Sequence, residues 1–130
     1  MNPRARICLI DDDSLVRDAL ALGLADAGFE VLTASGPAAG YDLVAREGVH
    51  AVVTDINMPG MGGAQLIAEL RAQWPRLPVV AISGAGLIES RGAEEIAAQL
   101  GANAVLAKPF RARQLAAVLD NLLTASGDRI

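Results

Sequence analysis

The sequence predicts an α/β fold, in which a five-stranded parallel sheet carries helices on both faces. Five short apolar runs recur along the 130 residues, and most are apolar at successive positions rather than alternating. Strands of that kind are buried on both faces, as in a parallel sheet covered by helices. Segments with helical spacing separate the runs, and a chain of 130 residues suits one hydrophobic core.

The expected strands are short. They cover residues 6–10, 30–34, 51–54, 78–82 and 104–107. The chain is 52% apolar but only 3% aromatic, so the core must be built from aliphatic side chains rather than rings.

The first helix is expected between the first two strands. Ser14 or Asp13 is placed to cap its start, and Gly28 ends it. Helical spacing brings three apolar side chains to one face, which is expected to point inward, with Ala25 at its margin: Leu15, Ala19 and Leu22.

Four further helices follow in alternation with the strands. The second covers 36–47, with Ser35 placed to cap it and Pro37 in its first turn. The third covers 63–73 and stops before Pro75. The fourth lies within 87–100 and ends at Gly101, and the last covers 112–123. The third helix carries Leu66, Ile67 and Leu70. In the last helix four side chains are expected to face inward: Leu115, Val118, Leu119 and Leu122.

This alternation predicts the topology. Right-handed crossovers make the chain doubly wound, and five strands favour the flavodoxin-like order 2-1-3-4-5. We expect a single domain over 1–130, with its core in about 5–123 and a tail or linker stub over 124–130.

Charge and composition exclude several classes of protein. Fifteen acids against eleven scattered bases give a net charge of −4, which argues against direct nucleic-acid binding. Cys8 is the single cysteine and cannot form an internal disulfide, so a reducing compartment is expected. The apolar runs are far shorter than the ~20 residues that span a bilayer. We expect a soluble cytoplasmic protein that does not cross a membrane.

Polar residues follow the strands that surround the point where strand order reverses. Ligand sites of open α/β sheets lie there, beyond the carboxyl ends of the strands. The sequence therefore predicts a site at this edge, built from the residues that end strands one, three, four and five: Asp11, Asp12 and Asp13, then Asp55, Ser83 and Lys108.

The charges of this cluster indicate its chemistry. Asp11, Asp12 and Asp55 carry three negative charges, which a divalent cation and Lys108 would balance. Oxygen ligands select a hard cation such as Mg²⁺, whereas zinc needs more nitrogen or sulfur ligands than the single histidine, His50, provides. A carboxylate beside Mg²⁺ can attack phosphorus, and Asp55, alone at the centre of the edge, is the best candidate nucleophile.

Four motifs in register resemble the receiver domain of two-component response regulators over about residues 5–123. Each motif lies at a strand end. They are Leu9-Ile10-Asp11-Asp12-Asp13, Val53-Thr54-Asp55-Ile56-Asn57-Met58-Pro59-Gly60-Met61-Gly62-Gly63, Ala81-Ile82-Ser83-Gly84 and Leu106-Ala107-Lys108-Pro109-Phe110.

The resemblance implies a role for each site residue. Asp55 would be phosphorylated, and Mg²⁺ would be held by Asp55 itself, by Asp12 directly, by Asp11 mainly through water and by the backbone carbonyl of Asn57. Ser83 and Lys108 would bind the phosphoryl group. The bond from Lys108 to the following proline would be cis.

The resemblance also implies partners. A sensor histidine kinase or histidine phosphotransfer protein would donate the phosphoryl group, and a downstream target or output domain would respond. The chain would not be an enzyme, although it would assist its own phosphotransfer and dephosphorylation. A homodimer is possible.

Two features depart from the family pattern. Val105 stands where many receivers have an aromatic ring that turns inward on activation, so switching through such a ring is not expected. The stretch between Ser83 and Lys108 is also longer than in the shortest members, and the extra residues predict a mobile loop over 85–92.

Other functions fit these residues less well. A haloacid-dehalogenase type of enzyme needs an Asp-x-Asp pair, which Asp11 and Asp13 match, but also a cap domain that 130 residues cannot hold. A flavodoxin needs a phosphate-cradling loop where this chain has three acids. A pseudo-receiver, which binds partners without phosphorylation, stays open because of Val105.

Overall fold

The computed structural model describes residues 4–57, 62–84 and 92–126. Its sheet contains β1 (Arg6–Ile10), β2 (Glu30–Ala34), β3 (Ala51–Asp55), β4 (Val79–Gly84) and β5 (Ala104–Lys108). All neighbouring strands are parallel, in the order β2-β1-β3-β4-β5, which confirms the predicted fold and strand order.

The strands reach further toward the carboxyl edge than expected. β3 and β5 each extend one residue beyond the predicted end, and β4 begins one residue later and ends two residues later. The added residues are Asp55, Ser83, Gly84 and Lys108. Strand pairing therefore includes the polar side chains themselves, with Asp55 beside Ile82 and Gly84 beside Lys108.

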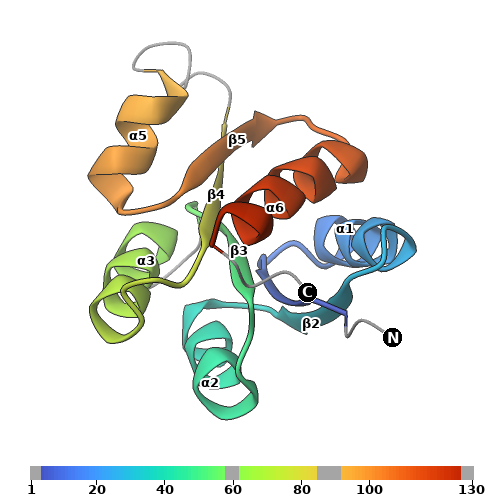
Figure 1. Cartoon of the computed structure of the whole chain (residues 1–130), viewed down its shortest axis with the longest axis horizontal. Helices are drawn as coiled ribbons and strands as arrows, with labels where there is room; N and C mark the ends of the chain where they lie inside the picture. Colours follow the sequence, from blue (N-terminus) through green and yellow to red (C-terminus); the bar gives the residue numbers. More distant parts are fainter. Residues whose placement is uncertain (1–3, 58–61, 85–91, 127–130) are drawn as a thin grey trace.

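Helices cover both faces of the sheet (Figure 1). α1 (Ser14–Asp26) and α6 (Ala112–Ser126) lie on one face, and α2 (Pro37–Glu47), α3 (Gly62–Gln73) and α5 (Ala93–Leu100) lie on the other. Each face has its own cluster of buried apolar side chains, and every residue of β3 is buried. This burial on two sides is why the strands lack apolar–polar alternation.

The inner face predicted for α1 is wrong. Leu15 is 81% exposed and Leu22 70% exposed, and the buried leucines are Leu20 and Leu24. The helix lies so close to α6 that a Cβ on Gly23 would overlap the side chain of Ala112. Contact between two helices therefore decides which face of α1 is buried, and helical spacing within α1 does not reveal it.

Several helix ends differ from the prediction. Asp13 rather than Ser14 caps α1, since its carboxylate accepts from the N–H groups of Leu15 and Val16. Gly36 is the N-cap of α2, with no side-chain cap bond, so Ser35 does not cap it. Gly101 ends α5 in the left-handed conformation, with φ of 81°, as expected of a helix-ending glycine. α6 continues to Ser126, so residues 124–126 are helical rather than part of a tail.

Some predictions fall outside the described residues. These are the loop over 85–91, any helical turn before residue 92, and residues 58–61 of the second motif. Within the described part of the chain, no helix is long and apolar enough to cross a membrane.

Candidate functional site

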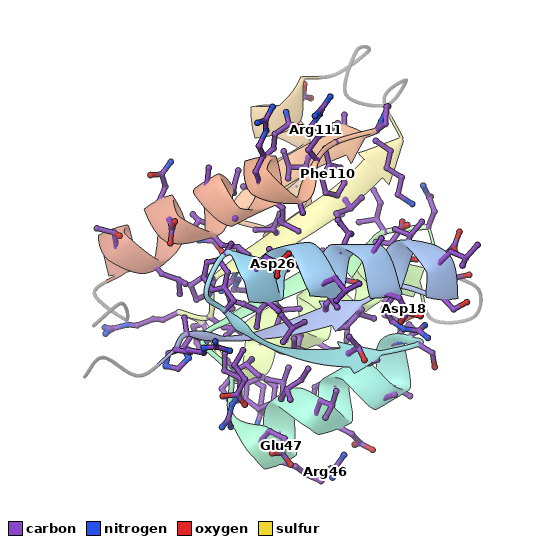
Figure 2. The ribbon with its side chains drawn as sticks, turned by 90° about the vertical axis from the view of Figure 1, so that its right-hand side faces the viewer. Asp18, Asp26, Arg46, Glu47, Phe110 and Arg111 are labelled. Atoms are coloured by element: carbon purple, nitrogen blue, oxygen red, sulfur yellow. The ribbon has the colours of Figure 1, made fainter. Side chains whose placement is uncertain are left out.

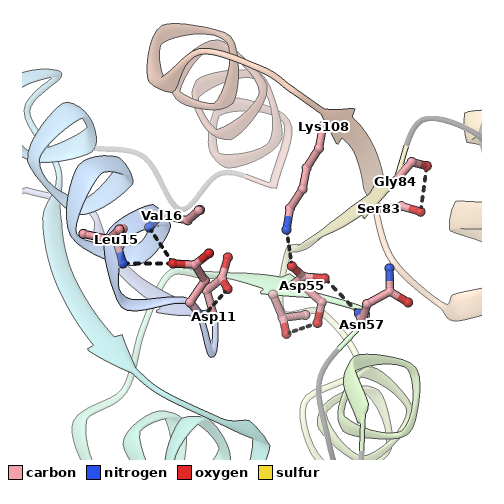
Figure 3. Close-up of polar contacts among 10 residues, drawn as sticks. Asp11, Leu15, Val16, Asp55, Asn57, Ser83, Gly84 and Lys108 are labelled. Carbon is pink, nitrogen blue, oxygen red and sulfur yellow. Dashed lines mark hydrogen bonds and ion pairs between the residues drawn. The ribbon is translucent and has the colours of Figure 1, made fainter.

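Asp55 and Lys108 form the centre of the predicted edge (Figure 3). Asp55 is only 3% exposed, and its Oδ2 accepts a hydrogen bond of 2.5 Å from Lys108 Nζ. Its Oδ1 accepts a second bond of 2.8 Å from the backbone N–H of Asn57. Both carboxylate oxygens are therefore held by donors, which fixes their direction.

The same contact affects the charge of Lys108. The hydrogen bond to Asp55 raises the pKa of Lys108, and the negative charges of Asp55, Asp11 and Asp13 act in the same direction, while burial opposes them. The ammonium group is thus kept charged at the edge of the sheet.

Asp11 is a second buried acid beside this pair. It is 1% exposed and follows β1, and its Oδ1 accepts from the backbone N–H of Asp13 at 2.9 Å. Its Oδ2 is buried and has no hydrogen-bond partner among the described residues. Burial raises the pKa of Asp11, and the negative charge of Asp55 raises it further, although the bond from Asp13 and the charge of Lys108 oppose this.

The unpartnered oxygen of Asp11 is the feature that fits a metal ion. A buried carboxylate oxygen without a donor is costly, and a hard cation would satisfy it. Asp12 is exposed, and across the described residues no three acid, histidine or cysteine side chains are gathered into a metal-binding group. The structure thus brings Asp11 and Asp55 together but does not bring the Asp12 carboxylate to them.

Ser83 lies at the end of β4, next to β3. It is 1% exposed, and its hydroxyl donates to the carbonyl of Gly84 at 3.3 Å rather than to Asp55. Figure 3 shows Ser83 on the opposite side of Asp55 from Asp11. The peptide bond between Lys108 and Pro109 is cis, as the resemblance implied.

Two residues that position the site were not found from the sequence. A Cβ on Gly63, at the start of α3, would overlap the main chain of Asp55 and Ile56, so only glycine lets α3 approach the end of β3. Arg17 of α1 donates from Nη1 to the carbonyl of Asp11 at 2.9 Å. The consecutive glycines Gly62 and Gly63 could have indicated the close approach of backbone segments in the sequence. No feature of the sequence around Arg17 indicates its contact with Asp11.

Known proteins that are similar to this chain all point to one family. A model described as the response regulator receiver domain matches residues 7–120. The chain is 38% identical over 111 residues to the response regulator protein FleR of Pseudomonas aeruginosa, covering 85% of this chain and 23% of FleR. It is 35% identical over 122 residues to the transcriptional regulatory protein PrrA of Mycobacterium tuberculosis, covering 94% of this chain and 51% of PrrA. It therefore spans about a quarter to a half of these relatives.

Solved structures agree. A response regulator receiver domain protein from Clostridium thermocellum superposes with a TM-score of 0.85 at 28% identity, over 95% of this chain and 97% of that one. NtrX from Brucella abortus gives a TM-score of 0.86 at 34% identity, over 96% of this chain and 28% of NtrX.

Proposed function

Because this chain belongs to the family of response regulator receiver domains, we propose that it accepts a phosphoryl group on Asp55 and so switches an output domain or a partner. One observation carries the proposal. Asp55 is a buried carboxylate with both oxygens held by donors, and it lies next to a second buried acid, Asp11, one oxygen of which has no partner among the residues that the structure describes. Such an arrangement fits a nucleophile that must be positioned before phosphoryl transfer.

The donor would be a phosphohistidine of a sensor histidine kinase or phosphotransfer protein. An oxygen of Asp55 would form the new O–P bond while the P–N bond breaks, and the leaving imidazole nitrogen would keep the bonding electron pair. Lys108 already lies at the carboxylate, so its ammonium can pair with an oxygen of the incoming group. The Ser83 hydroxyl, at the neighbouring strand end, would donate to another.

The residues that would hold Mg²⁺ are Asp11, Asp12, Asp55 and the backbone carbonyl of Asn57. When bound, the ion would supply positive charge to a phosphoryl oxygen. The buried Oδ2 of Asp11 supports this assignment, because a cation would satisfy it. For Asp12 to take part, its exposed side chain would have to turn toward the other two acids.

A donor protein would have to dock around the carboxyl edge to reach Asp55. Leu15 lies in the first turn of α1, just after the acid cluster, and is 81% exposed. Leu22 lies two turns further along α1 and is 70% exposed. Leu15 and Leu22 are seven positions apart and so share one side of α1, and an exposed leucine next to the acid cluster supports a docking role in this transfer.

The wider activity follows from the same proposal. The chain would not be an enzyme, although it would assist its own phosphotransfer and dephosphorylation. That it makes no direct contact with nucleic acid stays a prediction for these residues, since relatives such as PrrA are named transcriptional regulators. A cytoplasmic location and a homodimer likewise stay predictions.

Intact-mass spectrometry after incubation with acetyl phosphate tests the proposal. One added phosphoryl group should appear with Mg²⁺, disappear without it, and disappear in Asp55→Asn. Addition that persists in Asp55→Asn would place the acceptor elsewhere. The comparisons give no support to the pseudo-receiver alternative, but failure of both acetyl phosphate and a phosphohistidine donor would revive it.

A further inference from the structure

A pocket of about 490 Å³ lies at the opposite edge of the sheet from Asp55. Its wall is formed by the turn that leads into β3, from Gly48 to His50, and by the turn between α3 and β4. Four residue steps of β3 separate Ala51 from Asp55, or about 13 Å of strand. The pocket is therefore separate from the proposed phosphorylation site, and its volume is in the range of small-molecule sites.

Arg71 holds one wall of the pocket in place. Its Nη1 donates to the carbonyls of Pro75 at 2.9 Å and Leu77 at 2.7 Å, and its Nη2 donates to Asn103 Oδ1 at 2.9 Å. The ring of Trp74 packs at 54° on Tyr41, with 5.4 Å between the centroids. These hydrogen bonds and this ring contact are made within the protein itself, and a wall fixed in that way lowers the ordering cost of binding.

The pocket combines an apolar surface with hydrogen-bond donors. Its apolar wall is made by Val44, Val49, Trp74, Pro75, Leu77 and Pro78. The other lining residues are Gly48, His50, Gln73 and Arg76, and none of the lining residues, all within the described ranges, is acidic.

His50 is set to donate. Its Nδ1 accepts a hydrogen bond of 2.8 Å from the backbone N–H of Arg6. The neutral ring must therefore carry its proton on Nε2. His50 thus has an N–H donor at Nε2, and Arg76, an exposed residue that carries a guanidinium, lines the same pocket.

Hydrogen-bond donors without acids favour an anionic ligand, and the two helices that end at the pocket, α2 and α3, do not oppose this preference. Helix C-termini carry partial negative charge. Here Arg6 donates to the last carbonyl of α2, that of Glu47, at 2.9 Å, and Arg71 occupies the carbonyls that follow α3. Figure 2 shows Glu47 at this end of α2, far from Phe110 and Arg111. Guanidinium groups therefore bind the last carbonyl of α2 and two carbonyls of the turn that follows α3.

From these features we propose that the pocket binds a small organic anion with an apolar, aromatic body. The body would lie on Trp74 and the aliphatic wall, and the anionic head would pair with Arg76 and the Nε2–H of His50. The proposal is independent of phosphorylation at Asp55.

Three probes with one apolar body test it: 4-phenylbutyrate, 4-phenylbutan-1-ol and 4-phenylbutylamine. Trp74 is the single tryptophan, so its indole N–H gives one resolved signal in an ¹⁵N spectrum. We expect saturable shifts of that signal and of the Val49 and His50 amides with increasing probe concentration. The carboxylate should bind with the highest affinity and the amine with the lowest. No saturable shift, or equal affinity for carboxylate and amine, would overturn the proposal.

Substitution of Arg76 gives the second arm of the test. Arg76→Gln should weaken the binding of 4-phenylbutyrate about three-fold, which is the size expected for loss of an exposed ion pair. The affinity for 4-phenylbutan-1-ol should not change. The control Arg113→Gln changes an exposed arginine of α6, on the other face of the sheet, and should alter neither affinity. Equal weakening of carboxylate and alcohol by Arg76→Gln would contradict the assigned anionic head.

Discussion

Lys108 Nζ donates to Oδ2 of Asp55, so an ion pair joins the last residue of β5 to the last residue of β3, across β4. A phosphoryl group on Asp55 would lengthen the distance between these residues and replace the carboxylate as the acceptor. The ion pair therefore links the phosphorylation state of Asp55 to the position of β5, which lies at the edge of the sheet.

Lys108→Ala should leave Mg²⁺ binding present and weaken the structural response to phosphorylation. Among the described residues, Lys108 donates to Asp55, whereas the Oδ2 of Asp11 has no hydrogen-bond partner and is available to a metal ion. Backbone ¹⁵N shifts with and without acetyl phosphate measure the response, and a Mg²⁺ titration measures binding. An unchanged response would remove Lys108 from the switch.

The stability provided by the Lys108–Asp55 pair should be lost in alkali. The folded-state pKa of Lys108 is raised above the ordinary 10.5, so its contribution is fully present below 10.5 and falls as pH rises through the folded value. Urea unfolding of the native chain and of Lys108→Met should therefore differ at neutral pH and converge only as pH rises through the raised pKa of Lys108. A difference that stays constant would contradict the pair's role.

Asp11→Asn should stabilise the metal-free protein against urea, because it removes a buried carboxylate charge. The pKa of Asp11 is raised, which means that the fold holds its proton more tightly than the unfolded chain does. Its ionisation therefore destabilises the fold at neutral pH, and stability falls as pH rises through the raised pKa.

Urea unfolding with and without Mg²⁺ tests this prediction. Mg²⁺ should stabilise the native chain and have little effect on Asp11→Asn. The control Asp42→Asn changes an exposed acid of α2 and should behave like the native chain. Equal stabilisation of all three by Mg²⁺ would exclude Asp11 as a ligand.

Gly63→Ala should destabilise the fold by about 1–3 kcal/mol, the usual range for overpacking. The new Cβ would overlap the backbone of Asp55 and Ile56, which cannot move aside as a flexible side chain can. Gly36→Ala is the matched control, because a Cβ there would meet no atom of the described residues within 4 Å and its φ of −169° is extended. Similar unfolding midpoints for the two variants would contradict the close approach.

Leu15→Ala should slow transfer from a phosphohistidine protein by roughly three- to ten-fold, as for a residue central to an interface. It should not slow phosphorylation by acetyl phosphate, because Leu15 is 81% exposed and its side chain bonds to no site residue. Leu22→Ala, two turns away, should have the smaller effect. Equal slowing with both donors would indicate damage to the site rather than to docking.

The site could be located from the sequence because strand ends are local features. Parallel strands place their carboxyl ends at one edge, so Asp11, Asp55, Ser83 and Lys108 had to converge once the strands were recognised. The doubly apolar strands and the helix-ending Gly101 are likewise determined by neighbouring residues along the chain.

Only the tertiary structure decided how the elements contact one another. Helical spacing marked Leu15 and Leu22 as inward, but the contact of Gly23 with Ala112 turns Leu20 and Leu24 to the core instead. The run of three consecutive aspartates did not indicate that Asp11 is buried while Asp12 is exposed. A local pattern fixes which residues share a face, whereas burial of that face depends on a partner element distant in the sequence.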